Sequence, residues 1–346
     1  MPDVPKRPTR WLVTVAKVGV VVLVLWAVRA TLLEAWAQLG EYRWSFQVGW
    51  LVASGAIYLV ALLPAALFWH HVLTRMGQQA RLGESLRAYY ISHLGKYVPG
   101  KVMVVVLRTA LVRSARVEAP VAAVCVFFET LTMMAVGAVL AAAILATWFR
   151  DQWLLALIAL GLMAAAGLPT VPPVFRRLVR AARVGRTDPA VAEKIARAGF
   201  RTVALGWLYM TVGWCLMALS LWAVLMAMGF PDLDAVRQFP RYVASVSLAI
   251  VAGFLSLVPG GAVVREAVLS ELLVPYFATV GSSEVAPAAA VVSAVMLRVV
   301  WLIAELVASF LLYFGARPGD VPPASSIAEE LSEERNRISE EHSRIR

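Results

Sequence analysis

Charged residues are scarce in this chain of 346 residues: they make up 16% of it, whereas hydrophobic residues make up 60%. A soluble domain carries about 25% charged residues, because water must hydrate its surface. The shortage of charge excludes an ordinary soluble domain. Together with a strongly positive mean hydropathy, it predicts an integral membrane protein.

Cysteine and histidine are also rare. Cys125 and Cys215 both lie inside apolar runs, which excludes a disulfide framework and a spaced cysteine site for a metal. The four histidines do not form a spaced ligand set, and the chain has neither a P-loop nor a Gly-x-Ser-x-Gly sequence. We therefore expect no metal, no cofactor and no enzyme activity.

The net charge is nevertheless +10, and the positions of the basic residues along the chain indicate the kind of partner that this charge serves. Lysine and arginine concentrate in the N-terminal arm, in residues 70–82 and in residues 175–202. The alternate connections, 34–45, 148–152 and 229–240, carry only Arg43, Arg150 and Arg237. This alternation is the positive-inside pattern and is not typical of a nucleic-acid surface. We expect the plasma membrane, both termini in the cytoplasm and no nucleic-acid partner.

Six apolar segments are long enough to cross a bilayer, which takes about 20 helical residues: 12–33, 46–69, 119–147, 153–174, 203–228 and 285–314. The first is too long for the core of a signal peptide and has no clear cleavage site, so we interpret it as an uncleaved span. Two further apolar segments, 83–114 and 241–277, are interrupted by proline and glycine and are interpreted as re-entrant hairpins. The predicted fold is all-α: a polytopic membrane helix bundle over residues 12–316, after a cytoplasmic arm of residues 1–11.

The two broken segments contain similar motifs. "YVPGKVMVV" at 97–105 and "LVPGGAVVR" at 257–265 share a Val-Pro-Gly tripeptide, and three predicted spans lie between them. The second hairpin would therefore enter the membrane from the opposite side, which predicts an inverted-topology repeat with broken helices at the middle of the bilayer. The sequence leaves open that these are unrelated kinks, since proline and glycine are common in membrane helices. The predicted helix breaks are Pro99, Gly100, Pro259, Gly260 and Gly261.

Several charged side chains lie inside predicted membrane segments, where each costs roughly 2.5 to 3.5 kcal/mol unless it has a partner or a wet cavity. Helices that restart after the Pro-Gly breaks would present free N–H groups beside these cations, an arrangement that suits a phosphate. We predict that the lipid headgroup is bound by Lys96, Lys101, Arg108, Arg265 and Arg298. We predict Glu129 and Glu266 as the charges that balance these cations.

Alternatives for the same residues stay open. The charges could form structural ion pairs, for instance Glu129 with Arg265 or with Arg298. His93 could line the entry to the site or be an ordinary hydrogen-bonded residue. Glu305 continues the helical face of Arg298, which places a second charge on that face of the last span.

Two segments outside the predicted bilayer carry dense charge. Residues 317–346 are proline-rich and then highly charged, so we expect a partly disordered cytoplasmic tail; the spacing of Leu331, Ile338 and Ile345 permits no more than a short coiled coil. Within residues 175–202, one face of a short helix would carry Arg176, Arg180 and Arg183. An interfacial helix and a solvated loop fit that pattern equally well.

"GKYVPGK" at 95–101, Glu129, "PGGAVVRE" at 259–266 and Arg298 together resemble the lysylphosphatidylglycerol synthase transmembrane-region family, over roughly residues 12–314. The resemblance implies a lipid-translocating or lipid-associated protein of the bacterial or archaeal plasma membrane. The full-length synthases also carry an aminoacyl-transferase domain that has no counterpart in residues 317–346, so we expect no aminoacylation of lipid.

The chain departs from the family's pattern at two places. The family's second motif usually reads Pro-Gly-Gly-Leu-Gly-Val-Arg-Glu, whereas Ala262 and Val263 stand here in place of the leucine and the glycine that follows it. The family's third span often continues Glu-Arg-x-x-Asp, whereas this chain has Thr130 and Met133. The first difference affects close backbone packing in the second hairpin, and the second affects the polar network around Glu129.

Three functions remain in competition. The leading hypothesis is a flippase of an anionic phospholipid or of a polyprenyl-phosphate-linked amphiphile, moved by rocking of one repeat against the other. The second is a non-transporting partner or scaffold of a lipid-modifying enzyme or glycosyltransferase, bound through the tail and the basic loop. The third is an intramembrane transferase that uses Glu129 or Glu266 as a general base.

Overall fold

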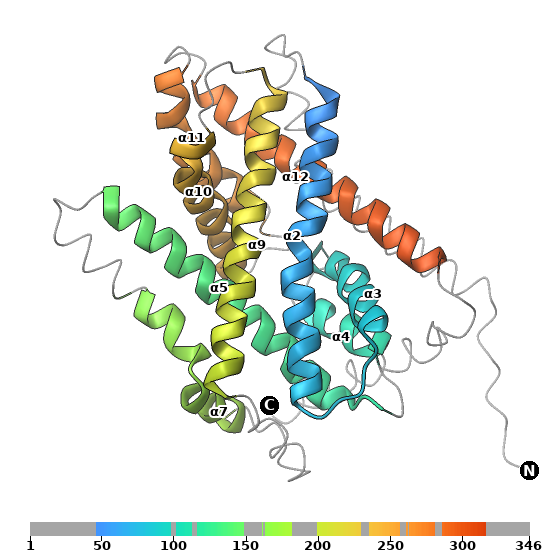
Figure 1. Cartoon of the computed structure of the whole chain (residues 1–346). Helices are drawn as coiled ribbons and strands as arrows, with labels where there is room; N and C mark the ends of the chain where they lie inside the picture. The colour runs from blue at the N-terminus through green and yellow to red at the C-terminus, as the bar shows by residue number, and fades with distance from the viewer. Residues whose placement is uncertain are drawn as a thin grey trace, which may run out of the picture.

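A computed structural model shows an all-α membrane helix bundle (Figure 1). The structure describes residues 46–97, 102–112, 116–148, 161, 163–181, 199–229, 235–256, 261, 263–280 and 286–315. Its main helices are α2 (Val48–Arg75), α3 (Leu82–His93), α4 (Val102–Val112), α5 (Ala119–Trp148), α7 (Pro172–Ala181), α9 (Phe200–Ala227), α10 (Ala235–Leu255), α11 (Val264–Val280) and α12 (Ala286–Phe314). Two short 3-10 helices are η1 (Leu94–Tyr97) and η2 (Leu168–Thr170).

Five helices in the described part of the chain are long and apolar enough to cross a bilayer. Four of them, α2, α5, α9 and α12, coincide with predicted spans. The fifth, α10, covers Val236–Leu255, a region that the sequence predicted as the first part of a broken hairpin. Its apolar run before the break is thus long enough to span by itself. Of the other two predicted spans, 12–33 lies outside the described residues, and so do residues 153–160 and 162 of the span 153–174. In the described part of 153–174, the 3-10 helix η2 interrupts the predicted span and α7 begins at Pro172.

Each segment that was predicted to be broken consists of two helices on either side of the expected break. In the first, α3 and η1 are followed by α4, and α3 and α4 pack against each other. In the second, α10 is followed by α11, and these two helices also pack together. Pro99, Gly100, Pro259 and Gly260 themselves lie outside the described residues.

The second hairpin turns at a close approach of two glycines. A Cβ atom added to Gly261 would lie 2.8 Å from the Cα atom of Gly253, which is too close for any side chain. Gly261 has a φ of 65° and Val263 a φ of 67°, so the backbone passes through the left-handed region just before α11 begins. Gly253 and Gly261 thereby hold the start of α11 against the end of α10.

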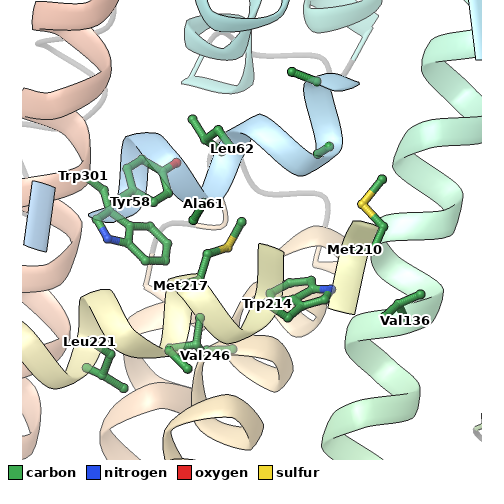
Figure 2. Packing of buried hydrophobic residues seen from close by; sticks show 14 of the residues in the cluster. Tyr58, Ala61, Leu62, Val136, Met210, Trp214, Met217, Leu221, Val246 and Trp301 are labelled. Atoms are coloured by element: carbon green, nitrogen blue, oxygen red, sulfur yellow. The ribbon is translucent and has the colours of Figure 1, made fainter. Parts of the chain in front are cut away.

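The centre of the bundle is the contact between α2 and α9, which run side by side in Figure 1. Ser54 and Ser220 each donate a hydrogen bond to the other's backbone carbonyl, at 2.8 and 2.9 Å, and Trp301 Nε1 of α12 donates to Ser220 Oγ at 2.8 Å. Small residues let the helices approach closely, and their hydroxyls bond across the interface. Beside this junction the ring of Tyr58 stacks on Trp301, with centroids 4.1 Å apart (Figure 2).

The first part of the basic loop forms the short helix α7 (Figure 1). Arg183, the third arginine of the predicted face, lies outside the described residues. Phe175 is buried against Phe128 of α5, with ring centroids 4.5 Å apart, whereas Leu178 is exposed. This packing helps to fix α7 to the bundle. Its contact with a membrane surface stays a prediction.

Candidate functional site

A cavity of about 320 Å³ lies between the two hairpins. The first hairpin contributes residues of α3, η1 and α4, and the second contributes residues of α10 and α11, while α2, α5, α9 and α12 complete the wall. One part of the wall is polar and is formed by Tyr58, Tyr89, His93, Lys96, Arg108, Glu129, Thr130 and Arg265. The apolar part includes Val104, Phe127, Leu131, Met134, Ile250 and Phe254.

A second hollow, of about 420 Å³, lies between α2 and α9, away from the two hairpins. Apart from Tyr209 it is lined by aliphatic side chains and Pro64. It therefore has no charged group to hold a headgroup, and the cavity between the hairpins is the better candidate site.

Arg108 and Glu129 form the most deeply buried ion pair, which joins α4 to α5. Arg108 Nη1 donates to Glu129 Oε2 at 2.8 Å, and Arg108 Nε donates to Ser92 Oγ at 3.0 Å. Tyr89 OH donates to Glu129 Oε1 at 3.1 Å, and the guanidinium of Arg108 lies 4.0 Å from the centroid of the Tyr89 ring. Both charges thus have several partners, as a buried pair needs in order to offset its desolvation.

Lys96 and Glu305 form a second pair, which joins η1 to α12. Lys96 Nζ lies 2.6 Å from Glu305 Oε1. The same oxygen accepts a hydrogen bond from Tyr58 OH and lies 3.8 Å from His93 Nε2. Three groups from three different segments therefore converge on one carboxylate oxygen.

Arg298 and Glu266 form the third pair, which joins α12 to α11, with Arg298 Nη1 donating to Glu266 Oε1 at 2.5 Å. Arg298 and Glu305 are seven residues apart on α12, which puts them on the same face of the helix two turns apart. Through these two side chains α12 is bonded to both hairpins: to η1 by Glu305 and to α11 by Arg298.

Arg265 differs from the other three cations. Its guanidinium lies over the ring of Trp301, 4.5 Å from the centroid, and it lines the cavity. Within the described part of the chain it makes no hydrogen bond and no ion pair with a carboxylate. An arginine in this position has donors to offer to whatever occupies the cavity.

The pairing of charges differs from the structural alternative that the sequence allowed. Glu129 is paired neither with Arg265 nor with Arg298, but with Arg108 of the first hairpin. Arg298 is paired with Glu266 instead. The sequence could not resolve these choices, because they depend on how the hairpins pack against α5 and α12.

The predicted headgroup residues occupy three kinds of position. Lys96, Arg108 and Arg265 line the cavity, together with Glu129, whereas Arg298 and Glu266 do not belong to its wall. Lys101 lies outside the described residues. His93, which was left open, lines the cavity as well.

Sequence reasoning missed the roles of Glu305, Tyr58 and Trp301. The role of Glu305 could have been predicted from the sequence, since it is a carboxylate inside an apolar span, on the same helical face as Arg298, and a buried carboxylate needs a cation nearby. The roles of Tyr58 and Trp301 could not, because aromatic residues in an apolar span are ordinary. Among the described residues, no group of histidine, cysteine and carboxylate side chains could hold a metal ion.

Comparison with known protein families gives a match over most of the chain. The profile of the family described as "Lysylphosphatidylglycerol synthase TM region" matches residues 13–307, which include both hairpins and every residue of the cavity wall. A search of curated proteins found no match to this chain. The matching profile describes the transmembrane region of these synthases, and the match carries no information on catalysis.

Proposed function

Because this chain belongs to the family of the lysylphosphatidylglycerol synthase transmembrane region, we propose that it is a lipid flippase that binds an anionic amphiphile in the cavity between the hairpins. The substrate class is a phospholipid, or a polyprenyl-phosphate-linked amphiphile, whose phosphate is held by Lys96 and Arg265. Transport occurs by rocking of one hairpin unit against the other.

Arg265 is the observation that carries this proposal. It lines the cavity and has no carboxylate partner among the described residues. A cation at membrane depth is costly unless an anion or water compensates it. A lipid phosphate supplies that anion, and Arg265 can bind it with two parallel N–H donors.

The balance of charge around the cavity supports the same conclusion. Among the described residues, four cations, Lys96, Arg108, Arg265 and Arg298, stand against three carboxylates, Glu129, Glu266 and Glu305. The difference, four minus three, leaves one positive charge in excess. The excess favours an anionic ligand over a cationic one.

The apolar part of the wall supports a ligand with a hydrocarbon tail. Phe127 of α5 and Phe254 of α10 both line the cavity, yet they are 60% and 38% exposed on the surface of the bundle. The cavity therefore continues from the polar groups to side chains that face the surroundings of the bundle. In a bilayer those surroundings are acyl chains, and a lipid could keep its tails there while its phosphate binds inside.

We place the protein in the plasma membrane with both termini in the cytoplasm. The support is the alternation of basic and non-basic connections along the chain, since lysine and arginine are retained on the cytoplasmic side.

The test is lipid exchange in vesicles that contain the purified full chain. The outer-leaflet fraction of a fluorescent phosphatidylglycerol is read by chemical quenching. We expect Arg265→Gln to reduce exchange to the rate of protein-free vesicles, because the variant loses the one cavity cation that has no carboxylate partner among the described residues. The proposal fails if Arg265→Gln exchanges lipid as fast as the unmodified protein.

Arg241→Gln is the matched control. Arg241 is a half-buried arginine of α10 that also lies over an aromatic ring, 5.6 Å from the centroid of Tyr276, but it does not line the cavity. Its replacement should leave exchange unchanged. Competition by soluble glycerol phosphate tests whether the site binds a lipid or a free phosphate ester. A lipid site should be little affected by it, whereas a site for free phosphate esters should be blocked.

A further inference from the structure

Glu305 is a buried carboxylate in the apolar span α12, and its neighbours are groups that can give or take a proton. Its Oε1 accepts hydrogen bonds from Lys96 Nζ, at 2.6 Å, and from the hydroxyl of Tyr58. The same oxygen lies 3.8 Å from His93 Nε2. Its Oε2 is buried and has no hydrogen-bond partner within the described part of the chain. One oxygen therefore accepts several hydrogen bonds, whereas the other accepts none. A charged oxygen without a hydrogen-bond donor is unfavourable inside a membrane span.

The other two buried carboxylates are held differently. Glu129 has both oxygens occupied, Oε1 by Tyr89 and Oε2 by Arg108. Glu266 also has an Oε2 without a hydrogen-bond partner among the described residues, but its Oε1 is bound to Arg298, whose side chain is only 4% exposed. Glu305 depends instead on a lysine, and the side chain of Lys96 is 24% exposed. Lys96 is the most exposed cation of the three pairs and it lines the cavity, so a ligand there can reach it.

A chain of hydrogen-bonding groups connects Glu305 to the cavity. His93 and Tyr58 line the cavity, whereas Glu305 does not. His93 Nε2 lies 3.4 Å from Tyr58 OH, and Tyr58 OH donates to Glu305. A proton that reaches His93 from the cavity can therefore be passed inward through Tyr58.

On the basis of the lipid binding proposed above, we propose that Glu305 takes up one proton when an anionic headgroup binds in the cavity. A phosphate bound by Arg265 also attracts Lys96, which weakens the hold of Lys96 on Glu305. A buried carboxylate that loses its counter-ion is strongly unfavourable, and protonation removes the charge.

The proton transfer balances without any other reactant. A solvent proton binds His93; His93 Nε2–H passes its proton to the oxygen of Tyr58, as Tyr58 releases its own proton to Glu305. Only N–H and O–H bonds change, and the step reverses when the lipid leaves. A phosphodiester carries one negative charge, so the lipid and the proton enter together without changing the net charge of the site. A gradient of pH across the membrane could then drive transport.

The remaining ionisable groups around Glu305 provide a constant background. They are Tyr97 of η1, Arg265 of α11 and Arg298 on α12 itself. Arginine and tyrosine side chains both keep their protons at neutral pH. Of the groups in contact with Glu305, those that can exchange a proton near neutral pH are His93 and Lys96.

The test measures binding of a fluorescent short-chain phosphatidylglycerol to the purified full chain in detergent, between about pH 5.5 and about pH 8.5. Uptake of one proton on binding requires Kd to rise about tenfold for each unit increase in pH over part of that range. In weakly buffered solution, a pH indicator should also report about one proton taken up for each lipid bound. This second measurement needs no variant.

Glu305→Gln should bind the lipid with a Kd that does not depend on pH and should take up no proton. Glu271→Gln, which replaces an exposed carboxylate of α11 outside the cavity wall, should keep the pH dependence of the unmodified protein. If the unmodified protein binds lipid without proton uptake, or if Glu305→Gln keeps the slope, Glu305 is not the coupling residue and lipid binding itself still stands. If no lipid binds at any pH, the flippase proposal and the coupling both fail.

Discussion

At the scale of single residues, Val263 has an unusual backbone conformation. It is β-branched and has a φ of 67°, a region that glycine adopts freely and that costs other residues roughly 1–2 kcal/mol. The family's usual motif has a glycine at this position. The turn between the two glycines and α11 therefore keeps a conformation that suits glycine, although this chain has a valine there.

Replacing Val263 by glycine should stabilise the protein. We expect a gain of about 1 kcal/mol, because relief of the strain exceeds the entropy that glycine adds to the unfolded chain. Thermal unfolding in detergent, followed by tryptophan fluorescence, measures the change. Val264→Gly is the control: Val264 begins α11, so its replacement should destabilise the protein by about 0.5–1 kcal/mol. Equal effects of the two substitutions would show that the φ of Val263 carries no strain.

The residue scale also shows what spacing along the chain could and could not predict. Arg108, Glu129 and Arg298 were recognisable because a charge inside an apolar span needs an explanation. Their partners were not, since Arg108 and Glu129 are brought together by the packing of α4 on α5. Glu305 was visible as a charge on the face of Arg298, but its contact with Lys96 crosses from α12 to η1.

At the scale of elements, glycines decide how closely α2, α5 and α9 approach. A Cβ atom on Gly206 of α9 would lie 2.5 Å from Cζ of Phe68 of α2, and one on Gly137 of α5 would lie 2.5 Å from Trp214 of α9. Because Phe68 and Trp214 are buried, their rings have little room to move aside. The absence of a side chain at these glycines is what allows the close contacts.

Gly206→Ala should therefore destabilise the bundle, by about 1–3 kcal/mol, because the added methyl group overpacks the contact with Phe68. Gly49→Ala in α2 provides the comparison, since a Cβ atom there would meet nothing within 4 Å. That substitution should be neutral or stabilising by up to about 1 kcal/mol through helix propensity. The free energy of unfolding in detergent micelles distinguishes the two, and an unchanged value for Gly206→Ala would contradict the close contact.

Elements were the part of the fold that the sequence predicted best. The spans α2, α5, α9 and α12 were recognised from apolar length alone, because each backbone group in lipid must be bonded within its own helix. The length of α10 was underestimated. Because a Pro-Gly motif follows it, the segment was interpreted as half of a re-entrant hairpin, although α10 is long enough to span a bilayer. The predicted break residues Pro259 and Gly260 lie outside the described residues, and the helix before them is longer than the sequence suggested.

At the scale of the whole molecule, the two hairpins meet across one cavity, and α12 is bonded to both of them. The sequence indicated two related motifs, and the structure places described residues from both hairpins on the wall of the same cavity. An inverted repeat remains a prediction. It would account for the position of the cavity, since such repeats form their substrate site where the two units face each other.

Removal of the tail, residues 317–346, distinguishes a transporter from a scaffold protein. If the cavity carries the function, a chain without these residues should exchange fluorescent phosphatidylglycerol at the rate of the full chain and unfold at the same temperature, because the cavity wall lies within residues 58–301. A scaffold would lose its lipid-modifying enzyme or glycosyltransferase partner in a pull-down. Loss of exchange on removal of the tail would contradict the assignment of transport to the cavity.

The sequence by itself determined that this protein resides in a membrane, where most of its spans lie and where two helices are interrupted. These properties follow from composition and local order, because lipid penalises any exposed polar group wherever it occurs along the chain. Only the tertiary structure decided which charges pair, that Arg265 faces a cavity without a carboxylate partner within the described residues, and that Lys96, Tyr58 and His93 converge on Glu305. Those contacts join residues up to 247 positions apart, and helix packing brings them within a few ångströms of each other.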